Sequence, residues 1–160
     1  MDYKIVKKEA FIVLATSREF SYKNAKEDIP LYWEEHYAEG NGKYICGMYG
    51  ISIDPLMGND SFLYLIADVY NPSVDIVEGL EVKTIPAFTW AVFPCKGALM
   101  QSLQTVNSKI FSEWLPQQRD YEIAAGYSVE MYDDASKYPN GTADHNYYSE
   151  IWIPIKRKNQ

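Results

Sequence analysis

The sequence predicts an α+β fold in which two β-α-β-β units join into one antiparallel sheet. Strand-like and helix-like segments follow one another in the same order in both halves of the chain. The dipeptide Ala10-Phe11 recurs as Ala87-Phe88, and 160 residues suffice for one domain or two small fused halves. In this arrangement two helices cover one face of the sheet, and we expect a ligand groove on the other face.

The first half predicts a strand, a helix and two further strands, at residues 10–16, 29–38, 44–53 and 61–69. Asp28 is a favourable N-cap residue, and Pro30 fits the first turn of a helix, where its missing N–H is not needed. Gly40 is typical of the position after the last helical turn. Together these residues predict where the first helix begins and ends.

The second half predicts the same order of elements, at residues 84–93, 99–115, 122–132 and 147–155. Its helix has apolar residues at helical spacing, and Pro116 ends the pattern. These apolar residues are Met100, Leu103, Val106, Ile110, Phe111 and Trp114. Residues 133–146 are rich in Asp, Asn, Gly and Pro, so they predict a mobile loop that shapes the rim of a pocket.

The repeated order predicts a single domain with two pseudo-symmetric halves, at about residues 1–76 and 77–160. A second identity supports the duplication, because Gly47 recurs as Gly126. Residues 71–79 contain proline and serine and are the natural link between the halves.

The net charge of −7 disfavours nucleic-acid binding, because contacts with DNA or RNA need a basic patch. The chain has no apolar run of about 18 residues that could span a membrane, and no apolar signal-peptide core at its N-terminus. Two cysteines, Cys46 and Cys95, do not make a secreted disulfide framework. We therefore expect a cytoplasmic protein that contacts neither nucleic acid nor a membrane.

Motifs for metal, cofactor or nucleophilic chemistry are missing from the sequence. His36 and His145 lie far apart and lack the spacing of zinc motifs, and the cysteines form no Cys-x-x-Cys pair. The sequence also contains no Gly-rich phosphate loop and no Gly-x-Ser-x-Gly elbow. We expect no metal and no cofactor, and a non-catalytic role is favoured.

The last predicted strand carries an acid between large aromatic residues. Strand alternation places the isoleucines at 151, 153 and 155 on one face, where they suit packing on helices. Tyr148, Glu150 and Trp152 share the other face. Burying an acid costs free energy unless a positive group pairs with it or a donor hydrogen-bonds to it. Glu150 therefore either contacts a ligand or is a structural carboxylate, held by a backbone amide, Lys96 or Lys109.

Three short segments share a pattern with one known family: residues 110–116 (IFSEWLP), 127–132 (YSVEMY) and 149–155 (SEIWIPI). They resemble the second helix, a following strand and the last strand of the GyrI-like small-molecule-binding domain. That domain is the effector-binding part of several multidrug-sensing and AraC-type transcription regulators, and it also occurs alone. The resemblance implies that Glu150 lies at the base of a pocket and meets cationic ligands. Because the two halves fill the chain, it resembles the stand-alone form without a DNA-binding domain.

Aromatic side chains around Glu150 complete the predicted site. Tyr64 belongs to it as the symmetric counterpart of Glu150 in the first half. The predicted ligand-binding residues are Glu150, Trp152, Tyr148, Trp90, Tyr127, Tyr64, Met48 and Trp33. Each contact between a cation and an aromatic ring contributes about 0.5–2 kcal/mol. We therefore expect a promiscuous effector sensor or sequestering protein for small cationic or amphipathic molecules.

Two other functions stay open. Some GyrI-like proteins resemble hydrolases of strained natural products, and Glu150 would then act as a general base while Tyr127 or Trp152 holds the substrate. Alternatively, the acidic surface competes with DNA for a basic protein partner, as in inhibitors of gyrase.

Overall fold

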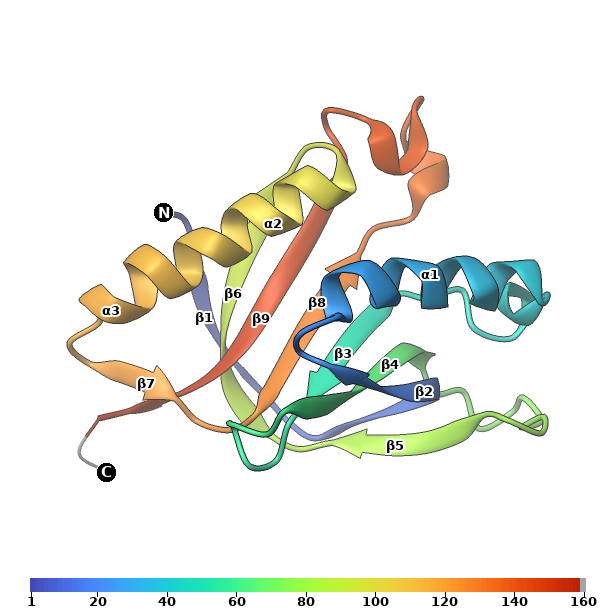
Figure 1. Cartoon of the computed structure of the whole chain (residues 1–160), viewed down its shortest axis with the longest axis horizontal. Helices are drawn as coiled ribbons and strands as arrows, with labels where there is room; N and C mark the ends of the chain where they lie inside the picture. Colours follow the sequence, from blue (N-terminus) through green and yellow to red (C-terminus); the bar gives the residue numbers. More distant parts are fainter. Residues whose placement is uncertain (159–160) are drawn as a thin grey trace.

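The computed structural model describes residues 1–158 and shows one nine-stranded sheet with two long helices on the same side (Figure 1). The strands are β1 (Lys4–Lys8), β2 (Phe11–Ser21), β3 (Tyr49–Ile53), β4 (Ser61–Val69), β5 (Glu81–Ile85), β6 (Phe88–Lys96), β7 (Tyr121–Ile123), β8 (Tyr127–Tyr132) and β9 (Tyr148–Arg157). Helix α1 spans Ala25–Ala38. Helix α2 spans Leu99–Lys109 and continues through a π-helical turn (Ile110–Trp114) into the short α3 (Leu115–Gln117).

The sheet order is β1-β6-β9-β8-β3-β4-β2-β5, with β7 paired to β9, and all pairs are antiparallel. The units β2-α1-β3-β4 and β6-α2-β8-β9 meet where β3 pairs with β8. The predicted α+β class and the repeated order of elements are therefore confirmed. Each edge strand pairs with the unit from the other half of the chain: β1 pairs with β6, and β5 pairs with β2. The division of the chain near residue 76 stays a prediction.

Several element boundaries differ from the prediction for local reasons. Helix α1 begins at Ala25, with Pro30 inside the helix rather than in its first turn. The strand predicted at 84–93 is divided at Pro86, which lacks the N–H that a strand ladder uses. The strand predicted at 122–132 is interrupted before Gly126, whose carbonyl accepts the Asp54 amide at 2.7 Å.

The loop predicted as mobile, residues 133–146, is tied down by its own hydrogen bonds. The Asp133 carboxylate accepts the Tyr138 hydroxyl at 2.7 Å and the Lys137 ammonium at 3.1 Å. The Tyr147 hydroxyl donates to the Asp133 carbonyl at 2.6 Å. These contacts fix the loop above the sheet, beside the N-terminal end of α2 (Figure 1).

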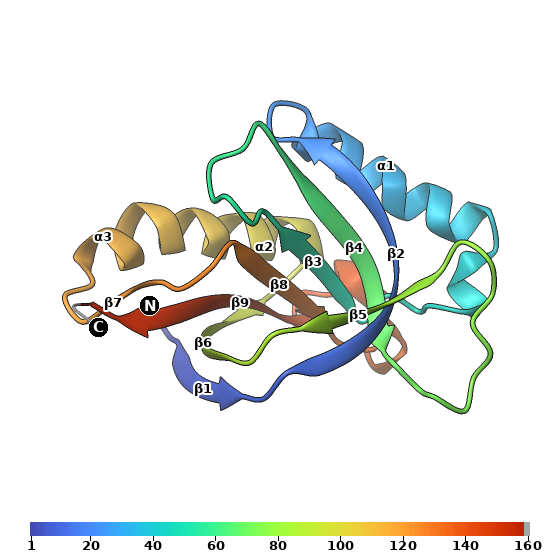
Figure 2. The same ribbon diagram turned by 90° about the horizontal axis from the view of Figure 1, so that it is seen from below.

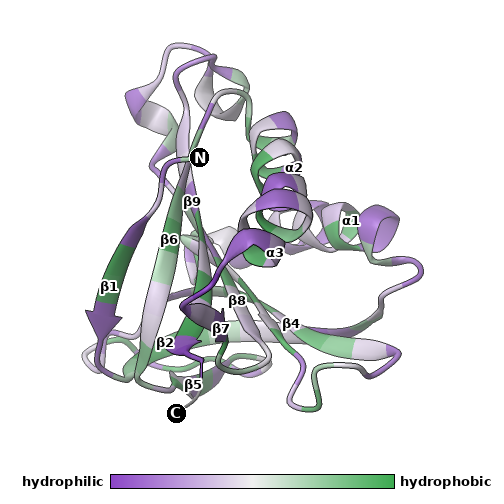
Figure 3. Ribbon diagram, turned by 90° about the vertical axis from the view of Figure 1, so that its left-hand side faces the viewer, coloured by the Kyte–Doolittle hydropathy of each residue, from purple (hydrophilic) through white to green (hydrophobic). Residues whose placement is uncertain are grey.

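Helix α2 packs on β6 and β9 through an apolar cluster. Its buried members are Ala91, Phe93, Cys95, Leu103, Ile110, Trp114, Ile151, Ile153 and Ile155. The predicted placement of the three isoleucines of β9 toward the helices is therefore confirmed. Figure 3 shows hydrophobic residues along β6 and β9, with the helix beside them.

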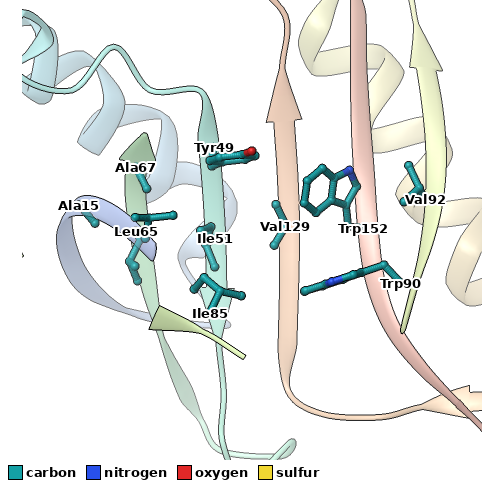
Figure 4. Close-up of a cluster of buried hydrophobic side chains, with 11 residues drawn as sticks. Ala15, Tyr49, Ile51, Leu65, Ala67, Ile85, Trp90, Val92, Val129 and Trp152 are labelled. Atoms are coloured by element: carbon teal, nitrogen blue, oxygen red, sulfur yellow. The ribbon is translucent and has the colours of Figure 1, made fainter. Parts of the chain in front are cut away.

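The helix-free face of the sheet is packed with side chains. The rings of Phe11 on β2 and Trp152 on β9 lie 6.3 Å apart, although three strands separate β2 from β9 in the sheet order. Strand spacing in a flat sheet would place them about 19 Å apart. The sheet therefore curls until its two halves meet, as seen from below in Figure 2. Ile51, Leu65 and Val129 are fully buried in the resulting cluster (Figure 4).

Candidate functional site

A groove of about 1220 Å³ lies between α1 and α2, above the central strands β3 and β8. Its floor is formed by side chains of β3, β4 and β8 that point toward the helices, and its walls come from the two helices and the loop after β8. The lining includes Trp33, Tyr37, Met48, Ser52, Tyr64, Met100, Leu103, Asn107, Ser128, Glu130, Tyr132, Lys137 and Tyr147. We expected the groove on the helix-free face, but the larger groove lies on the helix side. Curling of the sheet fills most of the helix-free face with core residues, and a smaller pocket of about 630 Å³, bordered by Ile53, Leu63 and Tyr127, is left there.

Strand alternation explains why an acid reaches this floor. Along β8, Val129 belongs to the cluster on the helix-free face, so Glu130 and Tyr132 point toward the helices. Tyr64 on β4 does the same and packs with the core beneath α1. The groove therefore brings Glu130, Tyr132 and Tyr64 together from two strands.

Hydrogen bonds connect these side chains to α1. The Trp33 indole N–H donates to the Tyr64 hydroxyl at 2.9 Å, and the Tyr132 hydroxyl donates to the Glu130 carboxylate at 2.8 Å. Both tyrosine hydroxyls lie over Gly50 of the intervening strand β3. No cationic side chain among residues 1–158 forms an ion pair with Glu130. The carboxyl group is therefore held by the Tyr132 hydroxyl alone, and no positive side chain balances its charge when it is ionised.

The surroundings of Glu130 favour its neutral form. Burial raises the pKa of the Glu130 carboxyl, and the hydrogen bond from Tyr132 opposes this rise. Burial also raises the pKa values of the Tyr64 and Tyr132 hydroxyls, so both stay protonated donors at neutral pH. The floor of the groove is thus an acid whose ionised form lacks a counter-charge, next to two neutral hydroxyls.

Replacing Glu130 with glutamine is expected to raise the free energy of unfolding at neutral pH. The pKa of Glu130 is raised in the folded protein, so the folded state holds this proton more tightly than the unfolded chain does. The protonated group therefore contributes its full stability below the pKa of the unfolded state. That contribution is lost as pH rises through the raised pKa of the folded state. Glutamine cannot ionise, so the variant does not lose this stability at neutral pH. Urea unfolding at pH 7 and at about pH 4 tests this: the difference between variant and parent should shrink at the lower pH. An equal difference at both values would contradict the raised pKa.

One wall of the groove is a backbone segment held by a single carboxylate, and the sequence pattern did not reveal it. The Asp68 carboxylate accepts the amides of Cys46, Gly47 and Met48 at 2.7, 2.9 and 2.8 Å. Gly47 has a φ of +87° and lies against the Trp33 ring, where a side chain would not fit. These residues were expected to be part of a strand, but their amides bond to Asp68 instead of to a neighbouring strand.

The predicted site residues separate onto two faces of the sheet. Trp33, Met48 and Tyr64 line the groove. The remaining five are Glu150, Trp152, Tyr148, Trp90 and Tyr127, and none of them belongs to the groove lining. Trp90, Trp152 and Tyr127 belong to or pack against the cluster on the helix-free face. Figure 4 shows Trp90 and Trp152 side by side there.

Glu150 is buried and already has hydrogen-bond donors. It is 8% exposed and accepts the Tyr148 hydroxyl at 2.5 Å and the Trp152 indole N–H at 2.9 Å. The Lys8 ammonium lies 5.5 Å from the centre of the Trp152 ring. The donors are thus the aromatic neighbours on its own strand, rather than Lys96, Lys109 or a backbone amide. Its role as a general base is not supported by this position, since it faces away from the groove.

Metal ligands do not gather in the described part of the chain. Among residues 1–158 no group of three or more His, Cys, Asp or Glu side chains is placed to hold a metal ion. His36 is buried, and its Nε2 lies 2.9 Å from the Ile45 carbonyl oxygen. Within the same residues, none of the helices has the length and hydropathy needed to cross a membrane.

Comparison with known proteins identifies the family of this chain. The model of the family described as "GyrI-like small molecule binding domain" matches residues 1–156. The chain belongs to the GyrI-like family. No curated protein matches this GyrI-like chain.

Solved structures share the GyrI-like fold at low sequence identity. The structure of SAV2435 bound to tetraphenylphosphonium is 22% identical, with a TM-score of 0.83 over 98% of this chain and 94% of the other. A putative transcription regulation protein from Staphylococcus aureus MU50 is 20% identical, with a TM-score of 0.79 over 98% and 99%. The C-terminal domain of EcmrR is 15% identical, with a TM-score of 0.54 over 97% of both chains. These similarities show the fold.

Proposed function

We propose that this GyrI-like domain binds small organic cations in the groove between α1 and α2, with Glu130 facing the positive group. The observation that carries the proposal is the Glu130 carboxyl group on the floor of an open groove. This carboxyl group has one hydrogen-bond donor, the Tyr132 hydroxyl, and no ion-pair partner among residues 1–158. An incoming cation would supply the missing counter-charge and favour the ionised acid.

The walls of the groove suit an amphipathic or aromatic ligand. Trp33 and Tyr132 meet edge to face, with ring centres 5.5 Å apart, and Tyr37 extends the aromatic wall along α1. Met48 and Met100 add flexible apolar side chains that adapt to different shapes. Because apolar burial is non-directional, we propose that the groove accepts a range of ligands rather than one.

A structural relative supports the cationic ligand class. SAV2435 was solved with tetraphenylphosphonium, an aromatic cation, and it shares the fold of this chain with a TM-score of 0.83. EcmrR, whose C-terminal domain also shares the fold, has been solved in a complex with DNA. We propose that the present chain acts as an effector sensor or a sequestering protein, and that it does not contact nucleic acid itself.

The test is calorimetric titration of the protein with tetraphenylphosphonium and with triphenylphosphine oxide, a neutral compound of similar shape. We expect saturable binding of the cation that is at least about tenfold tighter than binding of the neutral compound, which corresponds to about 1.4 kcal/mol. Equal affinity for both compounds would show that Glu130 does not contribute to binding through its charge. No saturable binding of either would contradict the proposed function.

Binding of tetraphenylphosphonium is expected to strengthen as pH rises. The ligand carries a fixed charge, so the change comes from the protein, and the raised pKa of Glu130 means that its ionised form appears above the usual range for glutamate. Asp133 and Asp134 at the rim have lowered pKa values, set mainly by hydrogen bonds from Tyr138 and Ser136, so they stay ionised throughout. Affinity measured from about pH 4 to pH 8 should rise, and a flat profile would argue against Glu130.

A further inference from the structure

Gly50 occupies the centre of the groove floor. The register of the sheet pairs Gly50 on β3 directly with Glu130 on β8, and with Ile66 on β4. Ile66 belongs to the core beneath α1, so this position faces the helices. The residue directly across from the acid therefore has no side chain.

The space beside Gly50 is filled by tyrosine hydroxyls. A methyl group at this position would overlap the Tyr64 hydroxyl and would lie 2.9 Å from the Tyr132 hydroxyl and 3.1 Å from Tyr64 Cζ. Tyr64 comes from β4 and Tyr132 from β8, so the two side chains converge over Gly50 from both neighbouring strands. Their hydroxyls both lie where a side chain on Gly50 would stand.

Backbone conformation does not explain this glycine. The glycines with a left-handed φ are Gly40, Gly47, Gly79, Gly97 and Gly141, and Gly50 is not one of them. Any residue adopts the backbone of a regular strand, and glycine in a strand interior weakens it. Gly58 offers a contrast, since the nearest atom to a methyl group there is the Leu56 carbonyl oxygen at 3.9 Å. Gly50 is therefore required for space rather than for chain flexibility.

We propose that Gly50 is a positioning residue of the groove: without a side chain, it lets the Tyr64 and Tyr132 hydroxyls meet and keeps Tyr132 bonded to Glu130. The Trp33 indole bonds to the same Tyr64 hydroxyl, so the arrangement links α1 to the acid across three strands. A side chain at this position would push the hydroxyls apart and would also stand beside the carboxyl group.

The test replaces Gly50 with alanine and follows the Glu130 side-chain carboxyl by ¹³C NMR titration in the ligand-free protein. The hydrogen bond from Tyr132 lowers the pKa of Glu130, so its displacement should move the titration midpoint upward. Tyr64 and Tyr132 have raised pKa values and do not titrate in the same range. Gly58→Ala is the matched control, and its midpoint should equal that of the parent protein.

A second-site change separates crowding from general damage. In the double variant Gly50→Ala, Tyr64→Phe the overlapping hydroxyl is gone, so the Glu130 midpoint should return toward the parent value. If Gly50→Ala alone does not fold, recovery of folding in the double variant supports the same overlap. An unchanged midpoint in a folded Gly50→Ala protein, or a double variant with no recovery, would overturn the proposal. Because no ligand is present, these results do not depend on the proposed function.

Discussion

Changing Glu130 to glutamine should weaken the binding of tetraphenylphosphonium by about 100-fold. Two unit charges about 5 Å apart attract each other by about 3 kcal/mol at an effective dielectric constant near 20, and each 1.4 kcal/mol is a factor of ten. Glutamine keeps the shape of the side chain and can still accept the Tyr132 hydroxyl, so the change removes charge and little else. Calorimetric titration at pH 7 measures the effect directly.

The matched control is the same acid-to-amide change at Glu150. This side chain lies on the helix-free face and is bonded to Tyr148 and Trp152, so its neutralisation should leave affinity unchanged within about twofold, which is less than about 0.5 kcal/mol. If Glu150→Gln abolished binding while Glu130→Gln did not, the ligand site would lie on the helix-free face. The pair of variants therefore decides between the site expected from the last strand and the groove that the structure describes.

Truncating Trp90 to alanine should lower the free energy of unfolding by about 3–5 kcal/mol. Trp90 is 1% exposed and packs edge to face on Trp152 and Phe88, with ring centres 5.9 and 5.4 Å apart. Deletion of the indole leaves a large cavity between the two halves of the curled sheet. For a chain of this length, the melting temperature should fall by roughly 10 °C, a few degrees for each kcal/mol.

Trp90→Phe is the matched control for this loss. The indole N–H of Trp90 has no hydrogen-bond partner among the described residues, so phenylalanine removes volume but no hydrogen bond. Its effect should be clearly smaller than that of alanine, and both variants should keep ligand affinity when folded. A Trp90→Ala protein with unchanged stability and lost affinity would instead make Trp90 a ligand contact. Thermal unfolding followed by circular dichroism measures the stability of each variant, and calorimetric titration measures its ligand affinity.

Much of the fold follows from local patterns. The apolar spacing from Met100 to Trp114 identified the second helix, and strand alternation placed Ile151, Ile153 and Ile155 toward it. The strand at residues 61–69 has the predicted bounds. These features depend only on neighbours in the chain, since helical and strand periods are set by backbone geometry. The pairing of β1 with β6 and of β5 with β2 joins distant segments, and no local pattern indicates it.

The sequence by itself determined two acids on strand-like segments, each two residues from a tyrosine: Glu130 before Tyr132, and Glu150 after Tyr148. The predicted site included only Glu150, and the pairing of the two strands, β8 with β9, is seen only in the structure. Alternation shows which residues share a face, but it does not show which face holds the larger groove. Only the tertiary structure decided that, because the curl of the sheet packs Trp90 and Trp152 against the other half while α1 and α2 stay apart above Glu130. The curvature of a sheet and the separation of two helices result from many contacts between residues that are distant in the chain. Those contacts place Glu130, and not Glu150, in the groove between the helices.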